Sequence, residues 1–378
     1  MKIAVIAQGS IPAQTANSIQ NMKMAAALTG LGNEVRVLAP GADPGISWSQ
    51  LANHYGLRNR FEIHWISFHL FLRRYDFALS AVRAAQKWRA DLVYTRLPQA
   101  AALAARRDIP TIFELHDLPS GTMGPWLLRR FLKASGARRL VVNTNHLAEM
   151  MRKRFELPSE RNLLVLAPNG VDVQRYTRLP EPQAARKNLG LLEGFTAGYT
   201  GHLYKGRGIR MIFELARKLP EMCFLLVGGR PEDVAHRKLQ ARELNNVHFT
   251  GFVPNAKLPV YQAACDVFLM PHSRRVACSS GTDIAEFTNP LKMFEYLACG
   301  RPIIASDLPI LREILSAENA VILPIGDTQA WLNALQMLRN SPSRRQTLSN
   351  AGKHTAVKFS WENRGRRVLQ DIEKIAKI

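Results

Sequence analysis

Cysteine is scarce in this 378-residue chain, and its placement argues against any cross-link or zinc site. The four cysteines form no Cys-x-x-Cys pair, and no histidine cluster accompanies them. Cys223, Cys265 and Cys299 lie in apolar runs, where a small buried hydrophobic residue is the expected role. We therefore expect neither a metal site nor a cofactor.

Long apolar runs are also missing. No stretch approaches the ~18 consecutive apolar residues that span a bilayer. The N-terminal run Met1–Ala7 is followed by Gly9-Ser10-Ile11-Pro12, which is typical of a buried strand and turn rather than a secretion signal. We expect a cytoplasmic protein, with peripheral attachment to the inner face of the membrane as the alternative.

Acidic residues are few relative to basic ones. The chain has 51 Lys and Arg against 30 Asp and Glu, a net charge of +21. Such an excess suits nucleic acid, an anionic membrane surface or phosphorylated substrates. A nucleic-acid-binding protein would show aromatic residues interleaved with clustered Lys and Arg, or a helix-turn-helix or RNA-recognition signature. The basic residues are instead dispersed, so we expect no nucleic-acid partner.

Short β-branched runs alternate with helical patterns along the whole chain, which predicts an α/β fold with parallel sheets. Thr196–Thr200 and Cys223–Val227 are two of the predicted strands. No strand is predicted between Glu34–Leu38 and Leu92–Thr95, and no helix between Thr328–Leu338 and the last helix of the chain. The pattern starts anew in the second half, and each half has the size of one Rossmann-like unit. We expect a first domain over 1–175 and a second over 176–359, with a linker near Asp172–Gly190. A last helix, about Trp361–Lys377, is expected to pack back on the first domain as part of 360–378.

The segment from Thr288 to Pro302 reads as a short helix followed by a buried strand. Asn289 is a good N-cap and Pro290 suits the first helical position. The free amides of such a helix start form an anion site, to which Lys292 adds a positive charge. Glu295, in mid-helix, requires a polar partner or solvent.

This segment resembles glycosyltransferase family 4, retaining enzymes of the group 1 type with GT-B architecture, in which two Rossmann-like domains face each other across a cleft. Other segments resemble the family in the same order along the chain: Pro168–Asp172, Tyr199–Gly206, Val227–Gly229, Gly251–Pro254, Ala264–Val267 and Ala305–Pro309. The resemblance implies a hexosyltransferase-type enzyme that uses a nucleotide diphosphate sugar.

The resemblance also implies roles for individual residues. Glu295 would bind the ribose hydroxyls of the donor, and Lys205 would neutralise its diphosphate. Arg207 is a candidate to replace the arginine that the family commonly has before that lysine. His116, at the end of a first-domain strand, would hydrogen-bond a sugar hydroxyl or orient the acceptor, and Arg96 is another candidate on that side. The remaining donor-binding candidates are Gly9, Gly201, His202, Gly229, Asn289, Pro290, Leu291 and Lys292.

Two positions depart from the family pattern. The family usually has a second acidic residue eight positions before Glu295, where this chain has Phe287; Glu286 and Asp283 are the nearest carboxylates. His202 stands where the family commonly has the arginine that precedes the diphosphate lysine. The missing first acidic residue keeps two alternatives open, a GT-B-fold epimerase and a non-catalytic binding subunit.

The acceptor is the least specified partner, and the resemblance allows a saccharide or a lipid-linked one. Residues 124–133 set Leu127, Leu128, Phe131 and Leu132 on one helical face and Arg129, Arg130 and Lys133 on the other. Residues 68–77 also mix aromatic and basic side chains. Such helices either lie in an anionic membrane interface or are ordinary amphipathic surface helices. The basic first half favours a lipid-linked acceptor, as in bacterial envelope polysaccharide, lipopolysaccharide or glycolipid synthesis.

Overall fold

The computed structural model describes residues 1–72, 74–155, 157, 163–276 and 286–372. The chain divides into two compact units, one formed by Met1–Asn169 with Trp361–Ile378 and the other by Gly170–Ser360. The chain thus passes into the second unit a few residues before the expected boundary at 175. The stretch expected as a linker lies in the second unit, where Pro182–Leu189 form α7.

The first unit is built on a parallel sheet of strand order β3-β2-β1-β4-β5-β6-β7. The strands are β1 (Lys2–Ile6), β2 (Glu34–Pro40), β3 (Glu62–Ile66), β4 (Leu92–Thr95), β5 (Thr111–Leu115), β6 (Ala137–Val142) and β7 (Leu164–Leu166). The helices are α1 (Ala16–Gly30), α2 (Trp48–Tyr55), α3 (Tyr75–Lys87), α4 (Pro98–Arg106), α5 (Met123–Leu132), α6 (Asn145–Arg154) and α15 (Trp361–Leu369).

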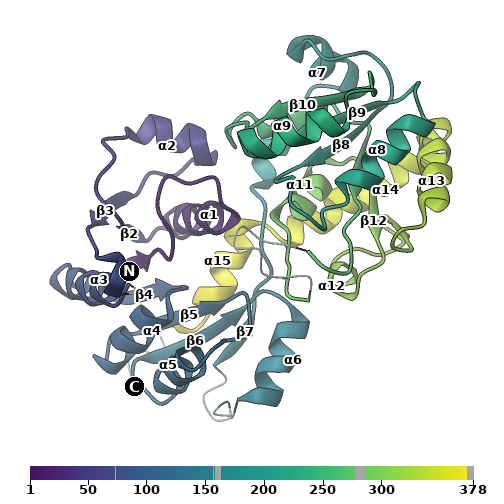
Figure 1. The fold of residues 1–378 in the computed structure, drawn as a ribbon. Helices are drawn as coiled ribbons and strands as arrows, with labels where there is room; N and C mark the ends of the chain where they lie inside the picture. The colour runs from purple at the N-terminus through teal and green to yellow at the C-terminus, as the bar shows by residue number, and fades with distance from the viewer. Residues whose placement is uncertain (73, 156, 158–162, 277–285, 373–378) are drawn as a thin grey trace. The chain divides into compact units, whose positions relative to one another are not determined.

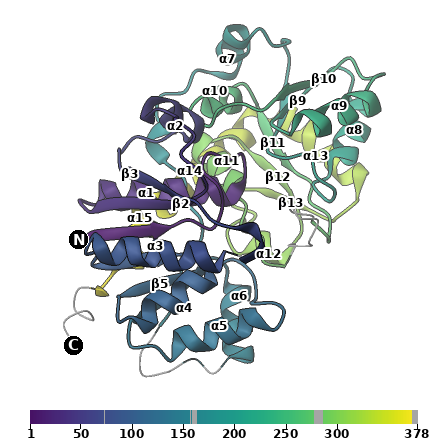
Figure 2. The same ribbon diagram turned by 60° about the vertical axis from the view of Figure 1, so that its left-hand side comes forward.

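Alternate residues of β1 enter two separate cores, because successive side chains of a strand point to opposite faces. Ile3 and Val5 pack with α1 and with Val368 of α15, while Ala4 and Ile6 pack with α3 and α4. Helix α15 lies beside α1 (Figure 1), and α3, α4 and α5 lie together on the other face (Figure 2). The C-terminal helix is therefore part of the first unit, although the second unit precedes it in sequence.

The second unit repeats this design, with strand order β10-β9-β8-β11-β12-β13. Its strands are β8 (Thr196–Thr200), β9 (Cys223–Val227), β10 (Val247–Gly251), β11 (Val267–Met270), β12 (Ile303–Ser306) and β13 (Val321–Leu323). Its other helices are α8 (Ile209–Lys218), α9 (Pro231–Gln240), α10 (Leu258–Ala263), α11 (Leu291–Cys299), α12 (Pro309–Arg312), α13 (Thr328–Asn340) and α14 (Pro342–Lys358).

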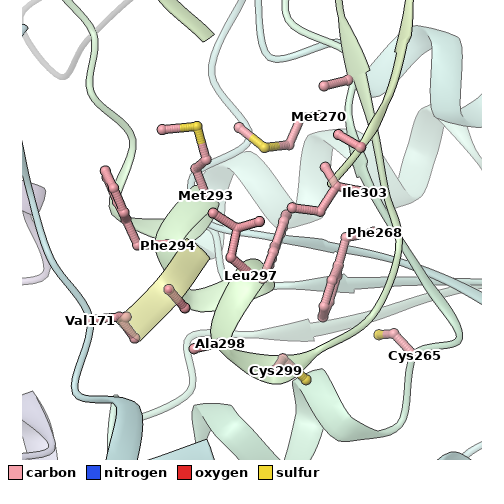
Figure 3. Packing of buried hydrophobic residues seen from close by; sticks show 14 of the residues in the cluster. Val171, Cys265, Phe268, Met270, Met293, Phe294, Leu297, Ala298, Cys299 and Ile303 are labelled. Atoms are coloured by element: carbon pink, nitrogen blue, oxygen red, sulfur yellow. The ribbon is translucent and has the colours of Figure 1, made fainter. Parts of the chain in front are cut away.

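Helix α11 is held in this unit by its apolar side. Met293 and Leu297 lie in the cluster that contains Phe268 and Ile303 of the sheet (Figure 3). The ring of Tyr296 stacks on that of Phe268, with centroids 3.8 Å apart. Because Met293, Tyr296 and Leu297 pack on the sheet, the orientation of α11 about its own axis is fixed.

The expected α/β class with two parallel Rossmann-like sheets is confirmed. The last helix differs from its prediction, because α15 ends at Leu369 rather than near Lys377. Asp371 has a φ of 59°, a left-handed conformation that interrupts a helix. Ile372, an apolar residue within the predicted helix, is buried, whereas Ile375 and Ala376 lie outside the described residues.

Candidate functional site

A tight loop follows β8 at the carboxyl edge of the second sheet. Gly206 and Gly208 flank Arg207 and have φ values of 84° and 75°, which only glycine adopts readily. A Cβ on Gly206 would lie 2.0 Å from the Arg275 carbonyl oxygen, and one on Gly208 would lie 1.9 Å from that of Pro271. The loop therefore packs directly on the segment after β11. In this strand order, the carboxyl ends of β8 and β11 meet where ligands of doubly wound folds bind.

Helix α11 begins one residue later than its sequence predicts. Pro290 occupies the N-cap with extended backbone angles and Leu291 is the first helical residue, so the expected N-cap role of Asn289 is wrong. Asn289 is instead buried before the helix. Proline has no side-chain acceptor, so the first amides of α11 receive no cap from Pro290 and remain suited to an anion.

Three basic side chains gather between this helix and the loop after β8. The Nζ atom of Lys292 lies 3.7 Å from the centroid of the Tyr199 ring, and a Cβ on Gly201 would lie 3.5 Å from Nζ. A nitrogen of Arg207 lies 3.5 Å from Nε2 of His272, which is fully buried after β11. Among the residues that the structure describes, none accepts or donates a hydrogen bond at Lys292 Nζ or His272 Nδ1.

Burial and mutual repulsion disfavour the charged forms of two of these groups. Burial, and then the charge of Arg207, hold the pKa of Lys292 well below its ordinary value, and Glu295 opposes this only in part. Burial, with Lys292 and Arg207, likewise lowers the pKa of His272. Such a cluster is stabilised by an anion, whose charge would offset the repulsion.

Glu295 projects from α11 toward a second polar group. Gln262 of α10, itself fully buried, donates from Nε2 to a carboxylate oxygen of Glu295 at 3.2 Å. The hydroxyl of Tyr176 donates to the amide oxygen of that glutamine at 2.9 Å. Glu295 thus has the polar partner that its mid-helix position requires, and its carboxylate is held beside the basic cluster.

The other candidates of the second unit line the ends of β8 and β9. Lys205 is exposed, and His202 is half-buried, stacked on the ring of Tyr204 at a centroid distance of 4.7 Å. Gly229 has a φ of 91°, and a Cβ there would lie 2.9 Å from Leu203. The structure therefore groups Arg207 with Lys292, and it is Arg207 whose charge acts on that lysine. His272 was not predicted as a site residue, because it lies outside the segments that resemble the family.

The first unit carries its candidates at the carboxyl ends of β1, β4 and β5. Arg96 donates to the Asn17 side chain at 2.9 Å, and Asn17 in turn donates to Gln8, the neighbour of Gly9, at 3.2 Å. Gly9 has no close neighbour that forbids a side chain, since a Cβ would be 3.7 Å from Asn17.

His116 follows β5, and its ring Nε2 contacts the carboxylate of Glu114, which is fully buried. Burial, and then the charge of Arg96, lower the pKa of His116 to about 4 despite this carboxylate. The imidazole is therefore neutral at pH 7, as a hydrogen-bonding role toward a sugar hydroxyl requires.

Residues 124–133 form most of α5, and their apolar face is part of the protein core. Leu127, Leu128 and Phe131 are buried, and the ring of Phe131 packs edge-on against Phe113 of β5. The face predicted as a candidate for membrane insertion is therefore unavailable. Exposed apolar side chains remain at the starts of helices, with Trp126 43% and Phe71 78% exposed.

Asp283 lies outside the described residues, and Glu286 is exposed. Within the described ranges, no three His, Cys, Asp or Glu side chains gather as a metal site would require. No helix in the described part of the chain is long and apolar enough to cross a membrane.

Two Rossmann-like units, each built on a parallel sheet, define an α/β protein of the GT-B class. Residues 194–341 match the model of group 1 glycosyl transferases, and residues 20–175 match that of glycosyltransferase family 4. The chain belongs to this family and is a glycosyltransferase.

Relatives of known name support the assignment. The chain is 27% identical to a GDP-mannose-dependent phosphatidylinositol monomannoside mannosyltransferase of Mycolicibacterium smegmatis, over 71% of this chain and 77% of the relative. It is 22% identical to a phosphatidyl-myo-inositol mannosyltransferase of Mycobacterium leprae, over 100% of this chain and 97% of the relative.

Solved structures share the fold. Sucrose-phosphate synthase of Thermosynechococcus elongatus superposes with a TM-score of 0.74 at 19% identity, covering 99% of both chains. HepE of Anabaena, in complex with UDP-glucose, gives a TM-score of 0.74 at 18% identity, covering 99% of this chain and 100% of that one.

Proposed function

We propose that this glycosyltransferase moves a hexosyl group from a nucleotide diphosphate sugar to a hydroxyl of a lipid-linked acceptor, with retention of configuration at the anomeric carbon. The observation that carries the proposal is the cluster of Lys292, Arg207 and His272 beside the uncapped start of α11. A diphosphate would supply the negative charge that offsets the repulsion among these basic groups. Glu295 lies on the same helix and would accept hydrogen bonds from the ribose hydroxyls.

The chemistry needs no metal ion in this scheme. The bond from the anomeric carbon to the diphosphate oxygen breaks, and the acceptor oxygen bonds to that carbon on the same face. The acceptor proton passes to the departing diphosphate. Lys205, Arg207, Lys292 and the amides of α11 stabilise the charge that grows on the leaving group.

The lipid-linked acceptor is supported by the relatives, whose names place phosphatidylinositol and its mannoside among their substrates. It is also supported by the first unit's surface. Phe71 and Leu72 precede α3, and Met123 and Trp126 begin α5, all of them exposed. Both helices pack against α4 and follow the carboxyl ends of strands, so these side chains lie at one edge of the unit. Arg130 lies over the Trp126 ring at 4.3 Å and adds positive charge there.

A donor screen tests the proposal. The protein is incubated with UDP, GDP and ADP sugars, and thermal unfolding and slow donor hydrolysis are measured. A donor at about 100 times its dissociation constant should stabilise the protein by ~2.7 kcal/mol. The hydrolysed sugar should keep the configuration of the donor. If no nucleotide sugar shifts unfolding or is cleaved, the proposal fails; a sugar nucleotide that is epimerised rather than cleaved would establish the epimerase alternative.

A further inference from the structure

A buried arginine of the C-terminal helix reaches the strand end that carries His116. The Arg364 side chain is 2% exposed and donates to Glu114 Oε1 at 2.7 Å. It also donates to the Pro168 carbonyl oxygen at 3.0 Å and lies 3.1 Å from the Tyr94 hydroxyl oxygen. Few arginines are buried this completely without a carboxylate partner.

Glu114 is the centre of this group. Its side chain is fully buried, and Oε1 accepts from Arg364, from Gln20 Nε2 at 2.8 Å and from His116. Burial acts to raise the pKa of Glu114, but the charge of Arg364 and then His116 outweigh it and leave the pKa below its ordinary value. Glu114 is therefore ionised, and an ionised carboxylate only accepts hydrogen bonds.

We propose that Arg364 and Glu114 are positioning residues that hold His116 as the neutral tautomer with its proton on Nε2, so that Nδ1 accepts a hydrogen bond from a substrate hydroxyl. The inference rests on the proposed function in giving His116 a substrate contact. The tautomer follows from the contact between His116 and Glu114. A carboxylate at Nε2 only accepts, so Nε2 must donate, and the other ring nitrogen of a neutral imidazole, Nδ1, then remains an acceptor.

The charged groups around His116 agree with a neutral ring. Arg96 and Arg364 both disfavour the imidazolium, while Glu114 favours it. Asp117 acts on Arg96 rather than on the histidine, and partly offsets the burial of that arginine. Arg364 thus compensates the Glu114 charge that would otherwise draw a second proton to the ring.

The helix that carries Arg364 is held close to the first sheet. The next residue, Gly365, faces α1, and a Cβ there would lie 2.9 Å from the Leu31 side chain. Val368, one turn later, is fully buried in the same core as β1. The C-terminal helix is thereby fixed in register with β5, so that Arg364 meets Glu114.

The test is nitrogen-15 NMR of histidine-labelled protein, with the His116 signal assigned by its loss in His116→Asn. In the unaltered protein, His116 should be neutral at pH 7 with the proton on Nε2. Arg364→Met should raise the pKa of His116 by about one unit or more, because Glu114 then draws a proton to the pair. Arg364→Lys, which keeps the charge and favours folding, should shift the pKa less.

Enzyme kinetics test whether the orientation of His116 by Arg364 and Glu114 affects turnover. Arg364→Met and Glu114→Gln should each lower kcat by about 10–10² fold, the range for a misplaced group. In the His116→Asn background, Arg364→Met should cause no further loss. Arg186→Met is the matched control, since Arg186 is a buried arginine paired with Asp266 at 2.9 Å in the second unit; it should leave the His116 signal unchanged.

Three results overturn the inference: an Nδ1-protonated or charged ring at pH 7, an unchanged pKa of His116 in Arg364→Met, or a further kcat loss in the double variant. A fully active His116→Asn with the expected NMR signals would instead remove His116 from the proposed reaction while the tautomer assignment stands. Failure of the donor screen with the expected NMR signals would refute the proposed function alone.

Discussion

The side-chain nitrogen Nζ of Lys292 lies 3.7 Å from the centroid of the Tyr199 ring, which belongs to β8. The two residues come from different elements, α11 and β8, and Tyr296 also ties these elements by accepting from the Thr200 backbone nitrogen at 2.7 Å. Arg207 and burial disfavour the charged form of Lys292 in the free protein, so an anion bound here would favour protonation of this nitrogen.

Replacing Lys292 should weaken donor binding. Lys292→Met removes the charge and keeps the length, and a lost charge-assisted contact of about 1.5–3 kcal/mol corresponds to a rise of ~10–10² fold in donor Kd. Isothermal titration calorimetry measures it. Lys218→Met, at the exposed end of α8, is the control and should bind the donor normally.

The same lysine predicts proton uptake on donor binding. The pKa of Lys292 is depressed in the free protein, and the bound diphosphate raises it, so binding is strongest below the free-state pKa and weakens as pH rises through the bound-state pKa. Calorimetry in two buffers of different ionisation enthalpy measures the uptake. Proton release, or equal uptake in Lys292→Met, would contradict this assignment; His272 is the group that would account for equal uptake.

The proposed scheme assigns stabilisation of the leaving group to both Lys205 and Arg207. Lys205→Ala should lower kcat by about 10²–10³, the range for one electrostatic stabiliser. Single-turnover kinetics would separate this effect from product release. If Lys205→Ala is fully active while Arg207→Ala is inactive, Arg207 holds the role alone, as its place beside His272 allows. The transferase scheme fails if neither substitution changes turnover.

Glu295 should act mainly in donor binding. Glu295→Ala should raise the donor KM with a smaller change in kcat, because the proposed ribose contact would be equal in the ground and transition states. Glu295→Gln keeps the contact with Gln262 and should have an intermediate KM. A large kcat loss with an unchanged KM would instead place Glu295 at the reacting centre.

Membrane binding should depend on the exposed edge of the first unit. Reversal of Arg129, Arg130 and Lys133 to Glu should weaken binding to anionic vesicles, and salt should do the same. Trp126→Ser should also weaken it, whereas Leu127→Ser should act only through stability, since Leu127 is buried. Vesicle sedimentation measures the bound fraction; equal binding to neutral and anionic vesicles would refute the surface.

Turnover should survive removal of divalent cations. The proposed leaving-group stabilisers are side-chain cations and helix amides, so EDTA should leave kcat within about twofold. Activity that is lost in EDTA and restored by Mg²⁺ or Mn²⁺ would show that a metal carries part of this charge.

Local sequence patterns were sufficient for most of the architecture. The bounds of β8 and β9 were predicted to the residue. β9 is a continuous apolar run, as is typical of a buried parallel strand, and β8 is bounded by β-branched threonines. β3 was missed, since its residues are partly or fully exposed and include charged and histidine side chains. α14 was missed for a related reason, as its long polar sequence gives only a weak amphipathic pattern.

The sequence by itself determined the family, the two-unit α/β fold and the segments that carry Lys205, Arg207, Lys292 and Glu295. Only the tertiary structure decided which of them meet. The apolar face of α5 proved to be part of the core. The sequence could not decide this, because an apolar helical stripe has the same pattern whether it packs on a sheet or on lipid. The pairing of Arg364 with Glu114 joins residues 250 positions apart, and no local pattern encodes which buried charges find each other.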